Sequence, residues 1–516
     1  MKPVLFLLFA SHLAIGADFP QWRGPQRNGV LADSPKLLDA MPKDGLKQLW
    51  ESEKIPAQDD GGLSSPIAAD GKVYVALVWH RNEPSTTRQI NDIVVRQLGW
   101  QNPAPLGKEL IEKMEKTREG LDSKLRGGKL EEFTQKFIDE NLDKKQQQLY
   151  AGMIKARFAK GKLAIPFDVL AALDKQTEKV FASEAEMKAW LDAQGWSEAI
   201  KAQIVAAVPP TIRMANDAVV CLDLASGKQL WKTELPGAAV GRGGSSTPVL
   251  GDGKIFAVAS TRVWALDAAT GKLAWETPLD KKRGIGSSPM LVDGVLVANI
   301  DKLIAFDAKT GTELWKQDKA GGGNASPVAW KAGDKTFVIA NGRAALDAVE
   351  LKTGAVAWSA PGGGDSTPAI SGDTLVVQTR KPDLGVVCYA LATVGATKRW
   401  NFPIDARRTQ SSPIISGGAA YFIEDDNAYC FDLATGSQRW TQPYPAQISS
   451  PLLADGKIFV LANNGNNVAA IKADPAAFTD LGRANVRAQW VPSPCIADGK
   501  LILRMKESVK AWALTP

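Results

Sequence analysis

Short apolar runs separated by polar turns fill most of the chain. In one clear example, Lys254–Ala259 alternates apolar residues and follows Asp252-Gly253, a dipeptide suited to a tight hairpin. A second run, Val263–Asp267, leads through the turn Thr270-Gly271 to Trp275. A period of two, interrupted by turn dipeptides every few residues, is typical of short antiparallel strands. We expect a four-stranded unit here, with the tryptophan on its last strand.

This pattern repeats along the chain. An acidic residue, a Thr-Gly or Ser-Gly turn and a tryptophan recur at Asp223–Trp231, Asp267–Trp275, Asp307–Trp315 and Asp432–Trp440, with weaker copies ending at Trp358 and Trp400. A Ser or Thr before proline opens an apolar run eight times, at Pro66, Pro248, Pro289, Pro327, Pro368, Pro413, Pro451 and Pro494. From the second of these prolines onward the intervals are 41, 38, 41, 45, 38 and 43 residues. Repeats of this length, each holding several short strands, are typical of β-propeller blades.

The two ends of the chain complete one another. Residues 493–516 predict three strands, and Leu46–Trp50 matches the tryptophan-bearing strand that this last copy lacks. Three strands from one end and one from the other make a four-stranded blade, so the ring closes by pairing its ends. The predicted fold is therefore all-β, an eight-bladed β-propeller.

The repeated tryptophans are predicted to be structural. Each side chain is large and flat and suits a wedge between adjacent blades, where burial contributes about 2 to 3 kcal/mol per copy. The predicted docking residues are Trp50, Trp231, Trp275, Trp315, Trp358, Trp400 and Trp440.

Blade one departs from the repeat, because its second strand, Val73–Trp79, is separated from its third, Ala218–Asp223, by more than 130 residues. In between, apolar residues recur at spacings of three and four, which predicts helices. Charges of both signs interleave, 22 Lys/Arg against 19 Asp/Glu in residues 81–213, which favours a packed accessory domain over a coiled coil or a membrane-binding face. The predicted helices are Gly107–Arg118, Leu130–Glu140, Leu142–Lys160, Glu184–Ala193 and Ser197–Val208.

The start of the chain predicts export. Residues 1–17 combine a charged start, an apolar core and small residues at the end, as in a signal peptide. We expect a soluble periplasmic or extracellular protein without a lipid anchor or a transmembrane segment. The predicted divisions are the signal peptide 1–17, an extended N-terminal arm 18–45, propeller 46–80, helical insertion 81–216 and propeller 217–516.

Composition excludes several classes of chemistry. The two histidines are His12, in the predicted signal peptide, and His80, which argues against histidine-based catalysis and haem attachment. The net charge of +6 is too small for this length to indicate nucleic-acid binding. No CxxC motif occurs, and we expect buried free thiols rather than disulfides at Cys221, Cys388, Cys430 and Cys495.

The loops before each Ser/Thr-Pro are the candidate binding surface, because they enter the strands that line the axis. Their arginines could bind a carboxylate, a phosphate or an acidic partner strand, and their glycines could let backbone amides approach a ligand. Alternatively, the glycines only permit close packing while the arginines pair with Asp365 and Asp405. No catalytic residue or metal ligand is assigned, and the predicted rim comprises Arg242, Arg283, Asn324, Asp365, Arg407, Arg408, Gln447 and Gln489.

The cassettes Asp267–Trp275 and Asp307–Trp315 closely resemble the tryptophan-docking motif of quinoprotein-like propellers, the PQQ-like repeat family. That family includes pyrroloquinoline quinone (PQQ) dependent alcohol dehydrogenases and the non-enzymatic assembly factor BamB. The resemblance covers residues 46–80 and 217–516. The opening Gln21–Pro25 with Asn28-Gly29 also resembles the start of secreted PQQ-like repeat proteins.

This resemblance implies a fold more strongly than an activity. In the dehydrogenases PQQ lies on the axis between a tryptophan floor and a disulfide of adjacent cysteines, with a calcium ion beside it. No adjacent cysteines occur in this chain, so none of those roles is carried over. We expect a monomeric, non-catalytic scaffold that needs no cofactor and binds protein partners at the cell envelope. The alternatives are a PQQ-dependent oxidoreductase with calcium and a divergent site, and a carbohydrate- or polyanion-binding module.

Overall fold

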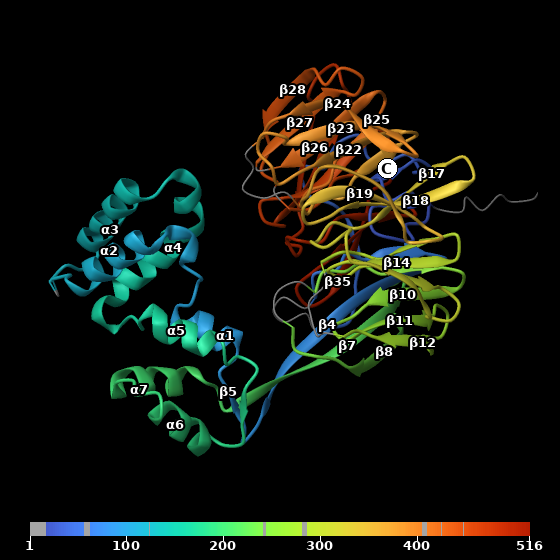
Figure 1. Ribbon diagram of the computed structural model, residues 1–516. Helices are drawn as coiled ribbons and strands as arrows, with labels where there is room; N and C mark the ends of the chain where they lie inside the picture. Colours follow the sequence, from blue (N-terminus) through green and yellow to red (C-terminus); the bar gives the residue numbers. More distant parts are fainter. Residues whose placement is uncertain are drawn as a thin grey trace, which may run out of the picture. The chain divides into compact units, whose positions relative to one another are not determined.

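The computed structural model describes residues 17–55, 62–122, 124–240, 244–280, 286–404, 410–424, 426–446 and 448–516. The chain divides into two compact units, Asn82–Met214 and the remainder. The remainder is built almost entirely of β-strands, and Figure 1 shows its sheets following one another in the order of the sequence colours.

Eight sheets of four or five strands make up this larger unit among the described residues. In hydrogen-bonded order, four of them are β3 (Ile67–Ala69), β4 (Lys72–Pro84), β7 (Thr211–Asp223) and β8 (Gln229–Pro236); β9 (Val249–Gly251), β10 (Lys254–Val258), β11 (Arg262–Asp267) and β12 (Leu273–Pro278); β13 (Met290–Val292), β14 (Val295–Asn299), β15 (Leu303–Asp307) and β16 (Glu313–Gln317); and β17 (Val328–Ala332), β18 (Lys335–Asn341), β19 (Ala345–Glu350) and β20 (Val356–Pro361). The others are β21 (Ala369–Ser371), β22 (Thr374–Gln378), β23 (Val386–Ala392) and β24 (Gly395–Phe402); β25 (Ile414–Ser416), β26 (Ala419–Glu424), β27 (Asn427–Asp432) and β28 (Gln438–Pro443); β1 (Val30–Leu31), β29 (Leu452–Ala454), β30 (Lys457–Ala462), β31 (Asn467–Lys472) and β32 (Asp480–Asn485); and β33 (Cys495–Ala497), β34 (Lys500–Arg504), β35 (Val509–Ala513) and β2 (Gln48–Glu51).

The core lies between neighbouring sheets. The middle strands, such as β10, are buried on both faces, whereas the outer strand β12 exposes most of its side chains. One hydrophobic cluster joins Tyr74 of the first sheet to Trp264 of the second, and another joins Phe256 to Phe306 of the third. Because each sheet packs on both sides, the middle strands lose the polar alternation of a half-exposed strand.

The ends of the chain meet in one sheet. Strand β2, near the N-terminus, pairs antiparallel with the last strand β35, as the sequence predicts. A further bond carries this closure to the first sheet, since the backbone N–H of Ser493 donates to the Ser65 hydroxyl at 2.8 Å. The last sheet is therefore joined to the first.

That bond belongs to a ring of hydrogen bonds around the axis. The N–H of the residue before each proline donates to the hydroxyl of its equivalent in the next sheet. Seven such bonds of 2.8 to 3.2 Å occur among the described residues, with donors Ser65, Thr247, Ser288, Ser326, Thr367, Ser450 and Ser493. This ring gives the Ser/Thr-Pro repeat a physical explanation, because alanine at the same place would remove the acceptor.

An N-terminal strap, residues 19–31, crosses the axis and reaches every sheet. Its backbone pairs with the first sheet at Phe19, accepts from the second at Pro20, and continues the seventh as β1 beside β29. The indole N–H of Trp22 donates to Ser493 of the eighth sheet. Two arginines of the strap, Arg23 and Arg27, contact the remaining four sheets.

Arg23 and Arg27 are 2% and 3% exposed, and both donate to backbone carbonyls of the ring. Arg27 binds the carbonyl oxygens of Pro327 at 3.1 Å, Pro289 at 2.8 Å and Ser288 at 3.0 Å. Arg23 binds those of Thr367 and Pro413 in the next two sheets. Neither guanidinium has a carboxylate partner among the described residues, and burial lowers the pKa of each to about 9. Two enclosed cations thus hold the centre of the ring through carbonyl dipoles.

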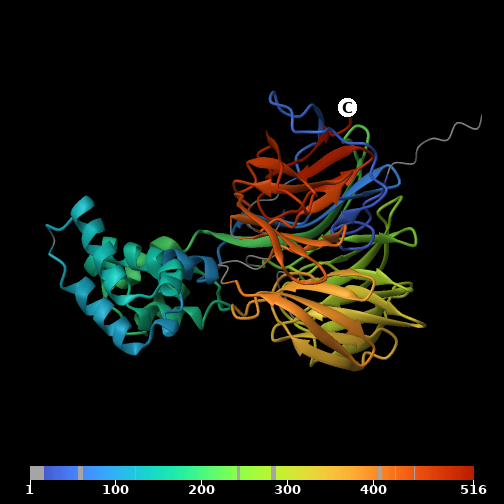
Figure 2. The same ribbon diagram turned by 90° about the horizontal axis from the view of Figure 1, so that it is seen from above.

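The helical unit has its own core. Its elements are β5 (Arg88–Gln89), α1 (Asp92–Leu98), η2 (Ala104–Leu106), α2 (Lys108–Glu119), α3 (Gly128–Asn141), α4 (Lys144–Lys160), η3 (Gly161–Leu163), α5 (Phe167–Asp174), β6 (Val180–Phe181), α6 (Glu184–Asp192) and α7 (Glu198–Ala207). Two apolar clusters hold it together, one around Leu170 and one around Ile154. Figure 2 shows these helices from a second direction. No described helix of the chain combines the length and apolar character needed to cross a bilayer.

Polar groups set the helix boundaries in this unit. Asp143 caps α4 with a capping box, so this helix begins two residues after the predicted start at Leu142.

A buried ion-pair cluster joins three helical side chains. The carboxylate of Glu115 lies between two buried arginines, Arg118 at 2.8 Å and Arg157 at 2.6 Å. The sequence prediction missed α1 and α5, because seven or eight residues are too short to show a helical period.

Acid is expected to weaken the sheets through their turn aspartates. The Asp267 carboxylate accepts bonds from the Thr270 hydroxyl and N–H, which lower its pKa. At Asp432 the ion pair with Arg439, followed by bonds from Thr435, lowers the pKa to about 2. Folding then favours the ionised form, so its contribution is complete above about pH 4 and is lost as the pH falls towards 2. The thermal midpoint should fall across that window, and the fall should be smaller in Asp432→Asn; equal slopes in both proteins would contradict this.

Candidate functional site

The axial cavity is the candidate site. It has a volume of about 370 Å³ and lies where the hydroxyl ring meets the loops that precede it. Trp22 of the strap and Trp490 line it together with five hydroxyls of the ring, Ser65, Ser288, Ser326, Ser450 and Ser493. The loops before the ring add Asn324, Asp365 and Gln410. The cavity thus combines aromatic surface with hydroxyl and amide groups and one carboxylate, a composition common in small-molecule sites.

The ring hydroxyls have a directional preference. Among the lining hydroxyls, the oxygens of Ser65, Ser288, Ser326 and Ser493 each accept a backbone N–H from the preceding sheet. Ser493 Oγ also accepts from Trp22 Nε1 at 3.3 Å. Oxygen atoms engaged in this way keep their O–H to donate. The floor of the cavity therefore presents a set of hydrogen-bond donors.

Asp365 is the one acidic side chain that the structure describes in the cavity lining, and it is already bonded. Its side chain is 4% exposed and forms an ion pair with Arg380. One carboxylate oxygen accepts from the N–H and the side-chain amide of Asn324, both at 3.1 Å. Its partner is thus Arg380, in the loop that follows β22 of the same sheet, and this carboxylate is positioned as a structural link.

The glycine loops around the cavity are held by buried amides. Asn299 accepts from the N–H of Gly322 at 2.7 Å, and Asn341 accepts from the N–H of Gly363 at 2.9 Å. A Cβ at Gly363, whose φ is +101°, would lie 2.9 Å from the carbonyl carbon of Ala344. The backbone N–H groups of Gly322 and Gly363 are thus bonded within the protein, and close packing explains the glycines of these two loops.

Several predicted rim residues fall outside the described part of the chain, namely Arg242, Arg283, Arg407, Arg408 and Gln447, as does Asp405. Asn324 and Asp365 lie together in the cavity lining. Gln489 donates its backbone N–H to the Arg504 carbonyl at 2.9 Å and is not among the lining residues. Sequence reasoning missed Trp22, Gln410 and the ring hydroxyls, although the Ser/Thr-Pro repeat marked the latter.

The repeated tryptophans contact the turn of the following sheet. Trp275 donates its indole N–H to the Ala308 carbonyl at 3.0 Å, and a Cβ at Gly311 would lie 2.5 Å from its ring. Equivalent bonds of 2.7 to 3.2 Å are made by Trp50, Trp231, Trp315, Trp400 and Trp440. Trp358 is equally buried, yet its N–H has no partner among the described residues. The turn after β23 also lacks the acidic residue that the other copies have at this place.

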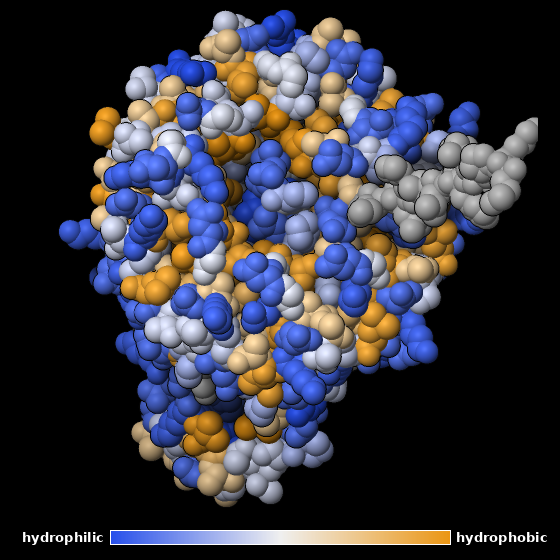
Figure 3. Space-filling model, turned by 90° about the vertical axis from the view of Figure 1, so that its right-hand side faces the viewer, coloured by the Kyte–Doolittle hydropathy of each residue, from blue (hydrophilic) through white to orange (hydrophobic). Residues whose placement is uncertain are grey.

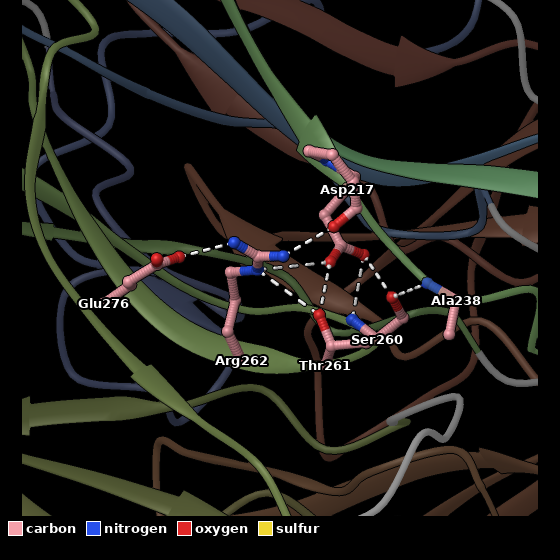
Figure 4. Close-up of polar contacts among 7 residues, drawn as sticks. Asp217, Ala238, Ser260, Thr261, Arg262 and Glu276 are labelled. Atoms are coloured by element: carbon pink, nitrogen blue, oxygen red, sulfur yellow. Dashed lines mark hydrogen bonds and ion pairs between the residues drawn. The ribbon is translucent and has the colours of Figure 1, made fainter.

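A buried carboxylate that the sequence did not single out lies between the first two sheets. Asp217 is fully buried, and burial raises its pKa. It accepts bonds from Ser260, at 2.9 Å from the N–H and 2.6 Å from the hydroxyl, and lies 3.7 Å from Arg262 (Figure 4). Arg262 also pairs with Glu276. The adjoining cavity of about 20 Å³ has room for about one water, and the printed contacts of this network join the two sheets.

The described residues do not fit the calcium and PQQ site of the dehydrogenases. All four cysteines are free and buried, as predicted, and burial raises the pKa of Cys221 to about 12 and of Cys388 to about 11. Among the described residues no group of three or more His, Cys, Asp or Glu side chains could hold a metal. The single described carboxylate of the cavity is already paired with Arg380.

Comparison with known proteins agrees with this architecture. Residues 215–442 match the family described as outer membrane protein assembly factor BamB. Tetrathionate hydrolase of Acidithiobacillus ferrooxidans is 27% identical over 39% of this chain and 44% of its own length. The dehydrogenase subunit of the quinone alcohol dehydrogenase of Komagataeibacter europaeus is 29% identical over 34% of this chain and 22% of its own length. This chain thus matches less than half the length of either protein.

BamB proteins are similar over a larger share of their length. BamB of Yersinia pestis is 24% identical over 49% of this chain and 69% of its own length. The crystal structure of BamB from Moraxella catarrhalis is 15% identical, with a TM-score of 0.45 over 57% of this chain and 88% of that one. Residues 215–442, somewhat less than half of the chain, thus match the BamB family model, and parts of the chain are similar both to BamB and to quinone-dependent alcohol dehydrogenases.

Proposed function

We propose that this protein is exported to the cell envelope and acts there as a non-catalytic scaffold for partner proteins. In this proposal the eight sheets are the blades of one closed propeller, and the helical unit is an insertion in its first blade. The match to the BamB family supports the scaffold role. The observation that carries the proposal is the state of Asp365, whose carboxylate is enclosed and bonded to Arg380 and Asn324 rather than open to a substrate.

A PQQ-dependent oxidoreductase is the second candidate. The specific observation in its favour is Trp22, an aromatic side chain in the lining of the axial cavity. Against it stands the lack of a fitting calcium set among the described residues. A carbohydrate- or polyanion-binding role would depend on rim arginines outside the described residues, and it predicts strong binding at low salt that collapses at high salt.

Titration with PQQ and calcium separates the first two candidates. For a scaffold we expect no heat of binding by isothermal calorimetry and no change in thermal midpoint, because the one described cavity carboxylate is already neutralised. The quinone without calcium and calcium alone are the controls. Saturable binding of PQQ together with a raised midpoint would overturn the scaffold proposal and favour the oxidoreductase.

A further inference from the structure

A second cavity, of about 530 Å³, opens beside the strap, beyond the hydroxyl ring and towards the turns that follow the innermost strands. The strap forms one wall, and the innermost strands β13, β17 and β21 form the other. Figure 3 shows a face of the molecule on which hydrophilic side chains gather in a central hollow. This second cavity is separate from the axial cavity, since the two share no lining residue.

The innermost strands of three sheets form backbone hydrogen bonds with the extended strap. In three sheets the residue two places after the repeated proline turns its backbone inward and pairs with the strap. Ala68 donates to Phe19 at 2.9 Å, and Leu250 donates to Pro20 at 2.8 Å. Leu453 donates to the Gly29 carbonyl at 2.8 Å. The inner edges of these sheets are thus completed by an extended segment of the same chain.

Three equivalent edges line the second cavity without a partner from the strap. Leu291, Ala329 and Ile370 are the second residues of β13, β17 and β21, and they lie one, three and one residues before the pair that closes each hairpin. Alternate residues of an antiparallel pair direct their N–H and C=O away from the partner strand, so these groups face inward. No hydrogen bond to these inward groups occurs among the described residues, and all three residues line the second cavity.

Strand β17 offers the longest of these edges. It has five residues, against three in each of its neighbours, so both Ala329 and Lys331 direct backbone groups inward. The charged groups of the lining are Arg27 and Lys331, and only Lys331 has a carboxylate partner, Asp293 at 2.9 Å. The cavity therefore combines an open strand edge with the uncompensated positive charge of Arg27.

We propose that the second cavity binds an extended peptide segment of a partner protein, which adds as a strand to the inner edge of β17. Backbone hydrogen bonds would supply affinity, as in other strand-addition complexes. The half-buried side chains of Leu291 and Ile370 favour apolar residues on the peptide, and Arg27 favours an acidic one. This inference rests on the proposed scaffold function, for which it names a binding surface and the chemistry of the partner.

A synthetic hexapeptide, Thr-Val-Asp-Val-Thr-Val, with blocked ends and a fluorescent label, tests the site by anisotropy with the full chain. We expect saturable binding that weakens about tenfold when the aspartate becomes lysine. N-methylation of alternate amides along one edge of the peptide should weaken binding about tenfold or more, whereas methylation along the other edge should not. Equal effects for both edges, or no binding by any of the peptides, would overturn the proposal.

A variant of the protein provides the complementary test. Ala329→Pro removes one inward N–H without removing a bond to β18, and proline is tolerated at strand edges. We expect peptide binding to fall about tenfold with an unchanged thermal midpoint. Unchanged binding would contradict the β17 site. The PQQ and calcium titration is independent of these results, so failure of the peptide site and failure of the scaffold function can be distinguished.

Discussion

Replacing Arg27 with alanine is expected to lower the free energy of unfolding by about 3 to 6 kcal/mol, the largest effect of any single change considered for this protein. The guanidinium donates to the buried carbonyls of Ser288, Pro289 and Pro327, which belong to two different sheets. Hydrogen bonds from a charged donor contribute about 1.5 to 3 kcal/mol each, and relief from burying the cation offsets part of their loss. Denaturant unfolding followed by tryptophan fluorescence measures the change.

Two further variants serve as controls, one at an exposed arginine and one that keeps the positive charge at position 27. Arg343 is 72% exposed and lies 3.7 Å from Asp301, so Arg343→Ala should change stability by less than about 1 kcal/mol. Arg27→Lys keeps the charge but cannot reproduce the fork of donors, so an intermediate loss is expected. If Arg27→Ala were as stable as the parent protein, the strap would not hold the ring together.

The second large effect is expected at Trp275. Its replacement by alanine should cost about 3 to 5 kcal/mol, because the indole fills the space between two sheets and its loss leaves a cavity. The change also leaves the Ala308 carbonyl without its 3.0 Å bond. The midpoint of denaturant unfolding is again the measurement, and a midpoint equal to that of the parent would remove this residue from the structural set.

Comparison with Trp358 isolates the hydrogen bond from the packing. The two side chains are 9% and 7% exposed, but only Trp275 donates its N–H to a carbonyl. Phenylalanine retains most of the packing and removes the donor. Trp275→Phe should therefore cost about 1 kcal/mol more than Trp358→Phe. Equal costs would show that the bond contributes nothing measurable.

Patterns that repeat were readable from the sequence, whereas contacts made once were not. The turn cassette and the Ser/Thr-Pro element recur often enough to reveal short strands and a sheet shared between the two ends. Residues 19–31 have no period, so the sequence predicted an extended strap but could not show that Arg23 and Arg27 bind the ring carbonyls. Asp217 escaped notice for the same reason, because its partners lie more than forty residues away in the chain.

The candidate site was harder to predict than the fold. The sequence placed Asn324 and Asp365 on the rim, and both line the axial cavity. One of its two interpretations paired Asp365 with rim arginines, which lie outside the described residues. Among the described residues Asp365 pairs with Arg380, in the loop that follows β22 of the same sheet. Which side chains pair depends on how loops from different parts of the chain approach one another, and the spacing of residues along the sequence does not show this.

The strap also constrains the order in which the protein can form. Its residues are synthesised before the sheets they contact, yet Trp22 bonds to Ser493 and strand β2 pairs with β35. A growing chain cannot complete these early segments until Ser493 and β35 have been made, and contacts of such long separation slow folding. Until then, strand edges stay open to other chains, so aggregation should be most acute for translation products that stop shortly before Ser493.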